Sequence, residues 1–241
     1  GVPTKTEQGD LWQTLGASQG DFPRLIVAPT SALDAFTTIP ELFNLVDHYQ
    51  CPGLVLSDLL ISEGTFSVDP DVINMNPVID RGALITEPST QNGYLRYKDT
   101  ESGIAPRAIP GIEGYIHVVS TDEHDEDGSL ISDEFTNPYK RRASVERRAR
   151  KFSDILDRVA APELQGPKDA EVTLVGWGSS EGAIKEAIDQ LKNRGITGNW
   201  LQVKWMVPFH GDAITAVVKN AKCTITVSYT HLRAHETLRY L

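Results

Sequence analysis

A short apolar run, a helical pattern and a second apolar run follow one another near the start of the chain, and this order constrains the fold most. The runs, residues 23–28 and 53–57, have the length of buried strands. Between them, apolar residues recur every three to four positions, as on one helix face: Leu33, Phe36, Ile39, Leu42, Phe43 and Val46. A strand, a helix and a strand over about 35 residues form a βαβ unit with parallel strands.

The residues at the ends of this helix indicate where it begins and where it changes direction. Ser31 is a candidate N-cap, and Asp34 places an acid in the first turn. Pro40 interrupts the pattern and predicts a kink or two shorter helices. Cys51 and Pro52 mark the end of the helix.

A second α/β unit follows in the last third of the chain. Its predicted elements are a strand at 171–175, a turn at 176–180, a helix at 181–194, a strand at 201–206, a helix at 212–220 and a strand beginning at 223. Gly195 would stop the first of these helices as a C′ glycine. The fold class is therefore α/β, with two parallel-sheet units.

The segment between the two units, residues 66–137, is rich in Pro, Gly, Asp and Ser and predicts an irregular connection with a few short strands. Residues 122–127 form an acidic run, which fits a solvated loop better than a metal site because adjacent carboxylates point apart. A basic amphipathic helix is predicted over 139–160. Its positive face either neutralises the acidic loop or docks a partner or an anionic ligand.

Charge and cysteine content exclude several functions. With 33 acidic and 23 basic residues the net charge is −10, which disfavours nucleic acids and anionic membranes as partners. The two cysteines, Cys51 and Cys223, are too few for an iron–sulfur cluster or a four-thiolate zinc site, and both are predicted to be buried. No apolar run reaches the roughly 18 residues of a membrane span. We expect a cytoplasmic protein.

The last residues of the chain need separate treatment. Residues 227–241 resemble the translation of a transposase-type sequencing adapter, and we expect them not to be native. His231 and His235 lie in this segment and are not assigned as zinc ligands. Because the chain also does not begin with Met, we expect a fragment that lacks both native ends, with native sequence over about 1–226.

Two loops could carry chemistry. Gly176, Gly178 and Gly182 surround a strand-to-helix turn whose free N–H groups could hold an anion, although a tight turn with a Ser cap is the favoured explanation. Arg107 stands in a loop bounded by Gly103 and Pro110, where it could meet a carboxylate or phosphate or pair with a local acid. No spacing indicates a catalytic triad.

Several motifs, in order along the chain, resemble those of the alpha subunit of the 2-oxoacid:ferredoxin oxidoreductases. Residues 1–11, GVPTKTEQGDL, resemble the end of the family's G-P-S-T-G-x-P-T-x-x-E-Q-x-D-L motif. Further resemblances are to P-x-x-V-L-S-D at 52–58, G-I-S-P-R-A-x-P-G at 103–111, D-E-H-x-E-x-G at 122–128, R-x-x-K within 147–151 and V-G-W-G-S at 175–179.

This resemblance implies a division of the chain. Residues 1–65 would be the end of a thiamine pyrimidine-binding-type domain and residues 167–226 the start of a transketolase C-terminal-like domain. Residues 66–166 would connect them, with the acidic loop and the basic helix.

The resemblance also implies a chemistry: oxidative decarboxylation of a 2-oxoacid, with 2-oxoglutarate favoured, to an acyl-CoA, with electrons passed to ferredoxin. Thiamine diphosphate and Mg²⁺ would be shared with a beta subunit, and the iron–sulfur cluster would lie in that partner only. The catalytic residues of the family lie upstream of Gly1.

Few site residues can therefore be assigned. Thr4, Glu7 and Asp10 are candidates for the active-site wall, and Arg107 for the oxoacid or acyl-CoA anion. His124 has no assigned role. Two alternatives stay open: a component of another thiamine enzyme, transketolase-like or a 2-oxoacid dehydrogenase, and a non-catalytic interaction module that uses the basic helix.

Overall fold

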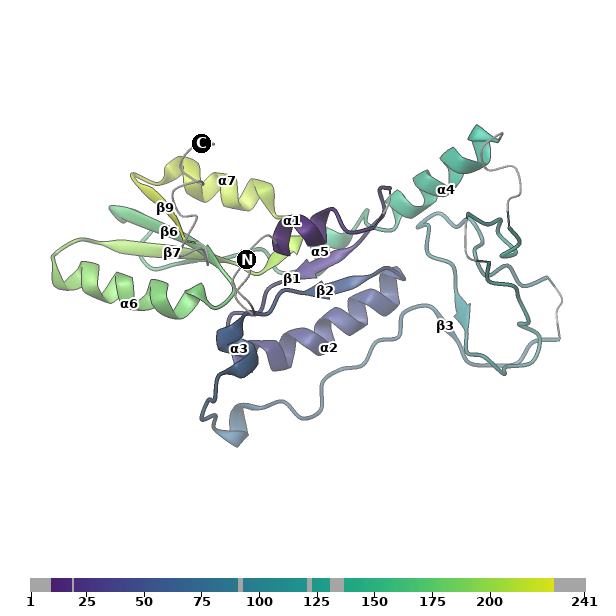
Figure 1. The fold of residues 1–241 in the computed structure, drawn as a ribbon, viewed down its shortest axis with the longest axis horizontal. Helices are drawn as coiled ribbons and strands as arrows, with labels where there is room; N and C mark the ends of the chain where they lie inside the picture. Colours follow the sequence, from purple (N-terminus) through teal and green to yellow (C-terminus); the bar gives the residue numbers. More distant parts are fainter. Residues whose placement is uncertain (1–9, 19, 91–92, 121–122, 131–136, 228–241) are drawn as a thin grey trace, which may run out of the picture.

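Two sheets and an irregular segment are arranged along the molecule. The computed structural model describes residues 10–18, 20–90, 93–120, 123–130 and 137–227. Figure 1 shows the four-stranded sheet (β5-β7-β6-β9) at one end, the three-stranded sheet (β2-β1-β8) in the middle and the irregular segment at the other end. The strands are β1 Leu25–Val27, β2 Gly53–Val55, β5 Leu164–Gln165, β6 Val172–Trp177, β7 Gly198–Val203, β8 Trp205–Val207 and β9 Thr224–Val227.

The predicted βαβ unit is present. β1 and β2 run parallel, from the pair Leu25 and Gly53 to the pair Val27 and Val55. β1 is fully buried, as predicted. The prediction of burial is wrong for β2, because β2 is an edge strand of its sheet and leaves Gly53 and Val55 exposed.

Helix α2, Ala32–Tyr49, follows β1 and packs on this sheet. Its predicted start is confirmed, because the Ser31 hydroxyl accepts a hydrogen bond from the Asp34 backbone N–H at 3.0 Å. The helix continues through Pro40, so of the two predicted outcomes, a kink or two shorter helices, the division is wrong. Pro40 removes one bond to the carbonyl of Phe36, and Phe36 lies on the exposed side, where water can replace that bond.

The buried stripe of α2 differs from the predicted one. It comprises Thr38, Leu42, Leu45 and Tyr49. Of the predicted apolar face, Leu33, Phe36 and Phe43 are exposed. The apolar pattern predicted the wrong face because it did not count Thr38, which occupies a core position. The Thr38 hydroxyl donates a hydrogen bond to the Asp34 carbonyl at 2.6 Å, so this polar group is satisfied inside the core.

The second unit is a parallel sheet with one antiparallel edge strand. β6 pairs in parallel with β7 and β9, and β5 pairs antiparallel with β7. Helices α6, Ser180–Asn193, and α7, Gly211–Asn220, lie on opposite faces of it (Figure 1). Gly195, at φ +77°, ends α6 as predicted, and the N–H groups of Gly195 and Ile196 donate to the Lys192 and Leu191 carbonyls.

The strand predicted over 201–206 is two strands in two different sheets. β7 ends at Val203, and β8 begins at Trp205 and pairs antiparallel with β1. The residue between them is Lys204, and its backbone carbonyl accepts a hydrogen bond from the Ala28 backbone N–H at 2.9 Å. The first sheet is thus parallel only between β1 and β2, because a strand from the second unit completes it.

One core joins residues from all three expected segments of the chain. Its members are buried apolar side chains from β1, α2, β8 and the segment before β5: Leu25, Val27, Leu42, Leu45, Tyr49, Ile155, Val159 and Trp205. The Tyr49 hydroxyl donates to Asp154 at 2.7 Å, so the one polar group of this aromatic side chain is satisfied inside the contact.

The helix predicted over 139–160 is divided. Helix α4 spans Pro138–Arg150 and helix α5 spans Ile155–Arg158. The turn between them lets Phe152 contact the Tyr49 ring edge-on, with centroids 5.2 Å apart, and brings Ile155 into the core. Leu156, the next residue of α5, is exposed.

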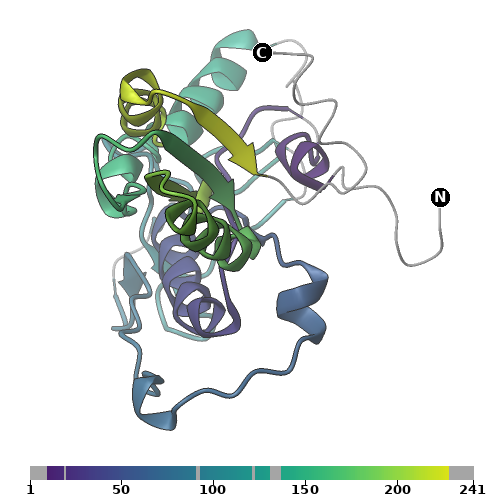
Figure 2. The same ribbon diagram turned by 90° about the vertical axis from the view of Figure 1, so that its left-hand side faces the viewer.

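The segment 66–137 is irregular where it is described, as predicted. Figure 2 shows it looping away from α2 before it returns to β3. Its short elements are the 3-10 helix η1 Pro70–Val72, β3 Leu84–Ile85 and β4 Arg107–Ala108, and α3 Leu59–Glu63 comes just before it. Helix α1, Asp10–Leu15, precedes β1. β3 and β4 form a separate parallel pair.

The two cysteines differ in burial. Cys51 is half-buried at the end of α2, whereas Cys223 is exposed. The prediction that both are buried is therefore wrong for Cys223, which comes directly before β9, an outer strand of its sheet.

Candidate functional site

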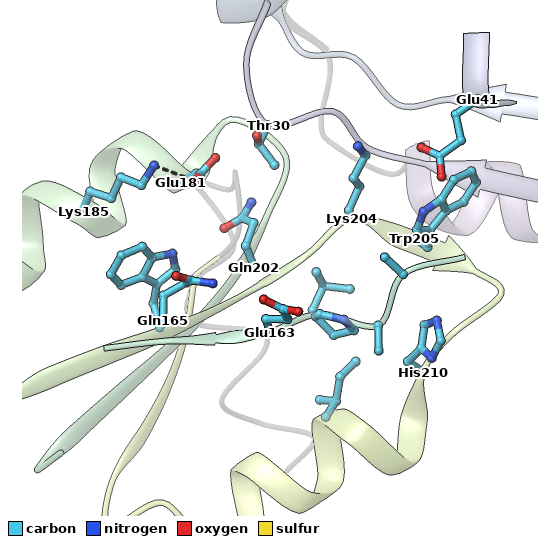
Figure 3. Close-up of a pocket in the computed structure, with 16 residues that line it drawn as sticks. Thr30, Glu41, Glu163, Gln165, Glu181, Lys185, Gln202, Lys204, Trp205 and His210 are labelled. Carbon is cyan, nitrogen blue, oxygen red and sulfur yellow. Dashed lines mark ion pairs between the residues drawn. The ribbon is translucent and has the colours of Figure 1, made fainter. Parts of the chain in front are cut away.

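The first candidate is a cavity of about 350 Å³ where the two sheets meet (Figure 3). β7, β8 and the residue between them supply Gln202, Lys204 and Trp205 to its wall, and helix α2 supplies Glu41. The chain crosses from one sheet to the other at Lys204, so this residue contributes to the cavity wall between the two sheets.

Charges in this cavity are mostly paired. The Lys204 ammonium lies 2.8 Å from the Asp34 carboxylate, and Lys185 pairs with Glu181 at 2.6 Å. Burial raises the pKa of Glu41, although Lys204 lowers it in part. The Gln202 amide donates to the Gly178 carbonyl at 2.8 Å, while its oxygen is buried without a partner. The cavity can orient a polar group, and we assign it no reaction.

The glycines of the predicted turn at 176–180 have separate structural roles. Gly176 lies in β6, where an added Cβ would come within 2.3 Å of Ile184, so its lack of a side chain permits helix α6 to pack. Gly178 has φ +58° and makes the turn. These observations favour the tight-turn interpretation over an anion site.

The second candidate is a cavity of about 410 Å³ at the C-terminal end of α2. We refer to it as the α2-end cavity. It is lined by residues from the end of α2, the loop that follows it, the irregular segment and β4: Val46, Asp47, Gln50, Cys51, Pro52, Arg96 and Arg107. Arg107 is among them. Of the four site residues proposed from the sequence, it is the one whose side chain the structure describes.

Arg107 is held in this cavity by a local acid. Its Nη2 lies 2.8 Å from Asp47 and 3.3 Å from the carbonyl of Arg81, and its side chain is 21% exposed. Asp47 also pairs with the Arg81 guanidinium. Gly82, at φ +63°, comes just before β3 and permits a close approach to α2, since an added Cβ would lie 2.7 Å from the backbone of His48. Arg107 thus pairs with an acid, as one of its two interpretations predicted, although this acid lies in α2 and not in the loop itself.

Two more cations surround Gln50, the C-cap of α2. Arg96 donates to its side-chain oxygen at 3.1 Å, and Lys151 donates to its backbone carbonyl at 3.1 Å. Burial lowers the pKa of Lys151 to about 8 and raises the pKa of the Cys51 thiol to about 12. Arg96 and Gln50 were missed by motif reasoning, whereas Lys151 belongs to the R-x-x-K motif but had no assigned role. The cation preference of a helix C-terminus could have indicated Arg96 and Lys151.

The acidic loop and the basic helix neutralise each other, as one of the two interpretations predicted. Glu123 pairs with Arg141 and Arg148, and Asp125 pairs with Lys140. Burial opposes ionisation of Glu123, but hydrogen bonds and charges from the two arginines together lower its pKa. This use of the α4 charges removes the reason to assign the helix to an acidic partner.

His124 lies within this contact. Its ring stacks on Tyr97, with centroids 3.7 Å apart, and burial lowers its pKa. No group of three or more His, Cys, Asp or Glu side chains in the described ranges is placed to hold a metal ion. Among the same residues, no helix combines the length and the hydropathy needed to cross a membrane.

The wall candidates near the start of the chain cannot be placed. Thr4 and Glu7 lie outside the described residues. Asp10 begins helix α1, and its side chain is likewise outside the description. His231 and His235 fall in the undescribed segment 228–241, whereas Val227 is the last residue of β9.

Family profiles match most of the chain. Residues 1–143 match the pyruvate flavodoxin/ferredoxin oxidoreductase thiamine diphosphate-binding family. Residues 170–235 match core domain II of pyruvate:ferredoxin oxidoreductase, and this match extends past Val227.

Individual relatives agree with these families. The alpha subunit of 2-oxoacid:ferredoxin oxidoreductase 2 from Aeropyrum pernix is 30% identical over 99% of this chain and 38% of its own length. Subunit KorA of 2-oxoglutarate oxidoreductase from Mycobacterium tuberculosis is 34% identical over 87% of this chain and 31% of its own. The chain thus spans about a third to two-fifths of the length of these relatives.

A solved structure has the same fold. It is the 2-oxoglutarate:ferredoxin oxidoreductase from Magnetococcus marinus with 2-oxoglutarate, coenzyme A and succinyl-CoA bound, with a TM-score of 0.76 and 26% identity over 99% of this chain and 41% of that one. Together with the thiamine-binding family match over more than half of the residues, this shows that the chain belongs to the alpha subunits of the 2-oxoacid:ferredoxin oxidoreductases.

Proposed function

We propose that this chain is part of the alpha subunit of an enzyme that oxidatively decarboxylates a 2-oxoacid to an acyl-CoA and passes the electrons to ferredoxin. We favour 2-oxoglutarate as the substrate, because relatives named for 2-oxoglutarate occur among both the sequences and the solved structures. We further propose a cytoplasmic location and a beta subunit as the partner.

The observation that carries the proposal is the agreement of sequence and fold over nearly the whole chain. The Magnetococcus marinus structure covers 99% of these residues at a TM-score of 0.76. A fold alone would not support a reaction, because one fold hosts many functions. Here the family match of residues 1–143 is specific to a thiamine diphosphate-binding domain.

Thiamine diphosphate would supply the electron sink for decarboxylation when bound. The described residues do not by themselves fit the whole cofactor, because they place no metal-binding cluster that could hold a diphosphate through Mg²⁺. We therefore derive no step through it from this chain. We propose that the alpha and beta subunits bind Mg²⁺ together, and that the beta subunit alone holds the iron–sulfur cluster.

Within this chain, we propose Thr4, Glu7 and Asp10 as wall residues of the active site. We propose Arg107 for an anionic group of the oxoacid or of acyl-CoA. The ion pair with Asp47 is compatible with this role, since the described contacts of the Arg107 guanidinium all use Nη2 and a guanidinium carries five N–H donors.

The test is to purify the full-length alpha chain together with its beta subunit and to measure CoA-dependent reduction of a viologen dye. We expect reduction with 2-oxoglutarate, and less with pyruvate or branched-chain oxoacids. Preference for another oxoacid would overturn only the substrate. No reduction with any of these oxoacids, or activity linked to a lipoyl acyltransferase instead, would contradict the proposal.

A further inference from the structure

We propose that the α2-end cavity is a binding site for a phosphate group, held between Arg96 and Arg107. The inference deepens the proposed function and rests on it for the carrier of that phosphate, which would be coenzyme A. The site itself is argued from the described residues alone.

The two arginines reach the same cavity from different segments. Arg107 lies in β4, and Arg96 lies in the irregular segment, where its guanidinium also stands 5.0 Å from the Tyr97 ring centroid. The described hydrogen bonds use Nη2 of Arg107 and Nη1 of Arg96. A guanidinium has five N–H donors in a planar fork that matches phosphate oxygens, so both side chains keep donors for a ligand.

Positive charge exceeds negative charge around the cavity. Arg81 and Arg107 share the single carboxylate of Asp47. No carboxylate among the described residues forms an ion pair with Arg96 or Lys151. The C-terminal end of α2 contributes only about half a negative charge. Asp80, which comes directly before Arg81 and accepts the Gly82 N–H, offsets a second cation. A surplus of about 1.5 positive charges therefore remains beside the cavity, and a bound phosphate would neutralise it.

The chemistry of the ligand follows from this surplus. A phosphate monoester carries between about 1.5 and 2 negative charges at pH 7 and offers three acceptor oxygens. A single carboxylate would neutralise only one of the cations. Val46 and Pro52 add an apolar wall on which the organic part of a phosphate ester can pack. Arg–phosphate contacts of this kind are strong because they are charge-assisted.

Asp47 makes the proposal sharply testable, because it competes with the ligand for Arg107. Removing an arginine should weaken phosphate binding, whereas removing the carboxylate in Asp47→Asn should strengthen it. A role of these residues in structure alone would not give opposite signs. Arg142 serves as a matched control, because it pairs with Glu146 on the exposed side of α4, outside the cavity.

The experiment uses the full-length alpha chain in complex with its beta subunit and measures binding by calorimetry at low salt. Inorganic phosphate is the first probe, and CoA and dephospho-CoA, which lacks the 3′-phosphate, identify the source of the phosphate. We expect Arg96→Gln and Arg107→Gln each to weaken phosphate binding about 10-fold, Asp47→Asn to tighten it, and Arg142→Gln to leave it unchanged.

Unchanged phosphate affinity in either arginine variant, or weaker affinity in Asp47→Asn, would overturn the proposal. Circular dichroism melts of each variant show whether a loss reflects misfolding, and the gain expected for Asp47→Asn cannot arise from misfolding. Dye reduction on the same preparations separates the two proposals. Oxoacid activity without arginine-dependent phosphate binding refutes the site alone, and the converse refutes only the proposed function.

Discussion

The four-stranded sheet and the loop packed against α4 lie at opposite ends of the molecule (Figure 1), and they bury different kinds of side chain. In the sheet unit, Leu174, Ile184 and Leu201 are at most 5% exposed. In the loop contact, the central buried group is the carboxylate of Glu123, which is surrounded by arginines.

This difference teaches where the protein is sensitive to its solution conditions. Apolar burial is non-directional and does not depend on protonation, so the sheet should be stable over a wide pH range. A charge contact weakens when its carboxylate is protonated or when salt screens it. The loop contact should therefore open before the sheet when the pH is lowered.

The largest expected effect is in the sheet unit. Ile184 is 1% exposed and packs directly over Gly176, so Ile184→Ala should destabilise the protein by about 3 kcal/mol through lost burial and a cavity. Urea denaturation measures this loss. Ile116, which is 97% exposed, is the control, and Ile116→Ala should change stability by less than about 0.5 kcal/mol. Equal losses in both variants would contradict apolar burial as the source.

The second effect concerns Lys151, whose pKa burial lowers to about 8. Below pH 8 the folded and unfolded states are both protonated, and the cost of burying the ammonium is fully present. Between pH 8 and about 10.5 the folded state loses its proton first, so the free energy of unfolding rises with pH.

Lys151→Met should abolish this rise. The difference between wild type and variant should change by about 2 kcal/mol between pH 7.5 and pH 10, as measured by urea denaturation at both values. Other groups that titrate there cancel in the comparison. A constant difference between the two proteins would show that the ammonium is not desolvated.

The third effect tests the loop contact. Glu123→Gln removes the carboxylate that pairs with Arg141 and Arg148 and should cost about 2 kcal/mol, since it leaves two cations without their partner. Because the pKa of Glu123 is lowered, its contribution is present above about pH 4.5 and is lost as the pH falls through the folded-state value.

Hydrogen exchange is the readout for this variant, with faster exchange expected in the loop and unchanged exchange in β6 and β7. The control is Glu146→Gln, which breaks an exposed pair with Arg142 and should cost only about 0.3 kcal/mol. If both variants loosen the loop equally, burial of Glu123 is not what holds it.

The smallest effect lies between the two regions. Lys204→Gln removes the partly buried ion pair with Asp34 that links the residue between β7 and β8 to α2, and should cost about 1 kcal/mol. Thermal melting measures it. Lys185→Gln, which breaks a local pair with Glu181 on α6, should cost about a third as much. The reverse order would mean that the Lys204 pair does not stabilise the junction.

Local signals in the sequence were reliable where one residue decides the backbone. Ser31 begins α2, Gly195 ends α6, and the parallel βαβ unit forms. The failures share one cause, which is packing against residues far away in the chain. The buried face of α2, the division of the basic helix at 151–154 and the split of residues 201–206 all depend on what each segment contacts.

The sequence identified one residue of the α2-end cavity, Arg107, but not the residues that surround it. The Gly- and Pro-bounded loop identified Arg107 because rigid loops often position an arginine. Its partner Asp47 lies on a helix 60 positions earlier, and Arg96 lies in a segment without any pattern. Only the close approach of β3 and β4 to the end of α2, permitted by Gly82, brings these charges together.

The sequence by itself determined the α/β fold class, the family, the start of α2 and the end of α6, because these depend on local periodicity, capping residues and motif order. The tertiary structure alone decided which sheet receives Trp205, which acids neutralise the basic helix and which cations meet at the end of α2. The physical reason is that ion pairs and core contacts form between side chains that the chain brings together from distant positions, and no local pattern encodes that pairing.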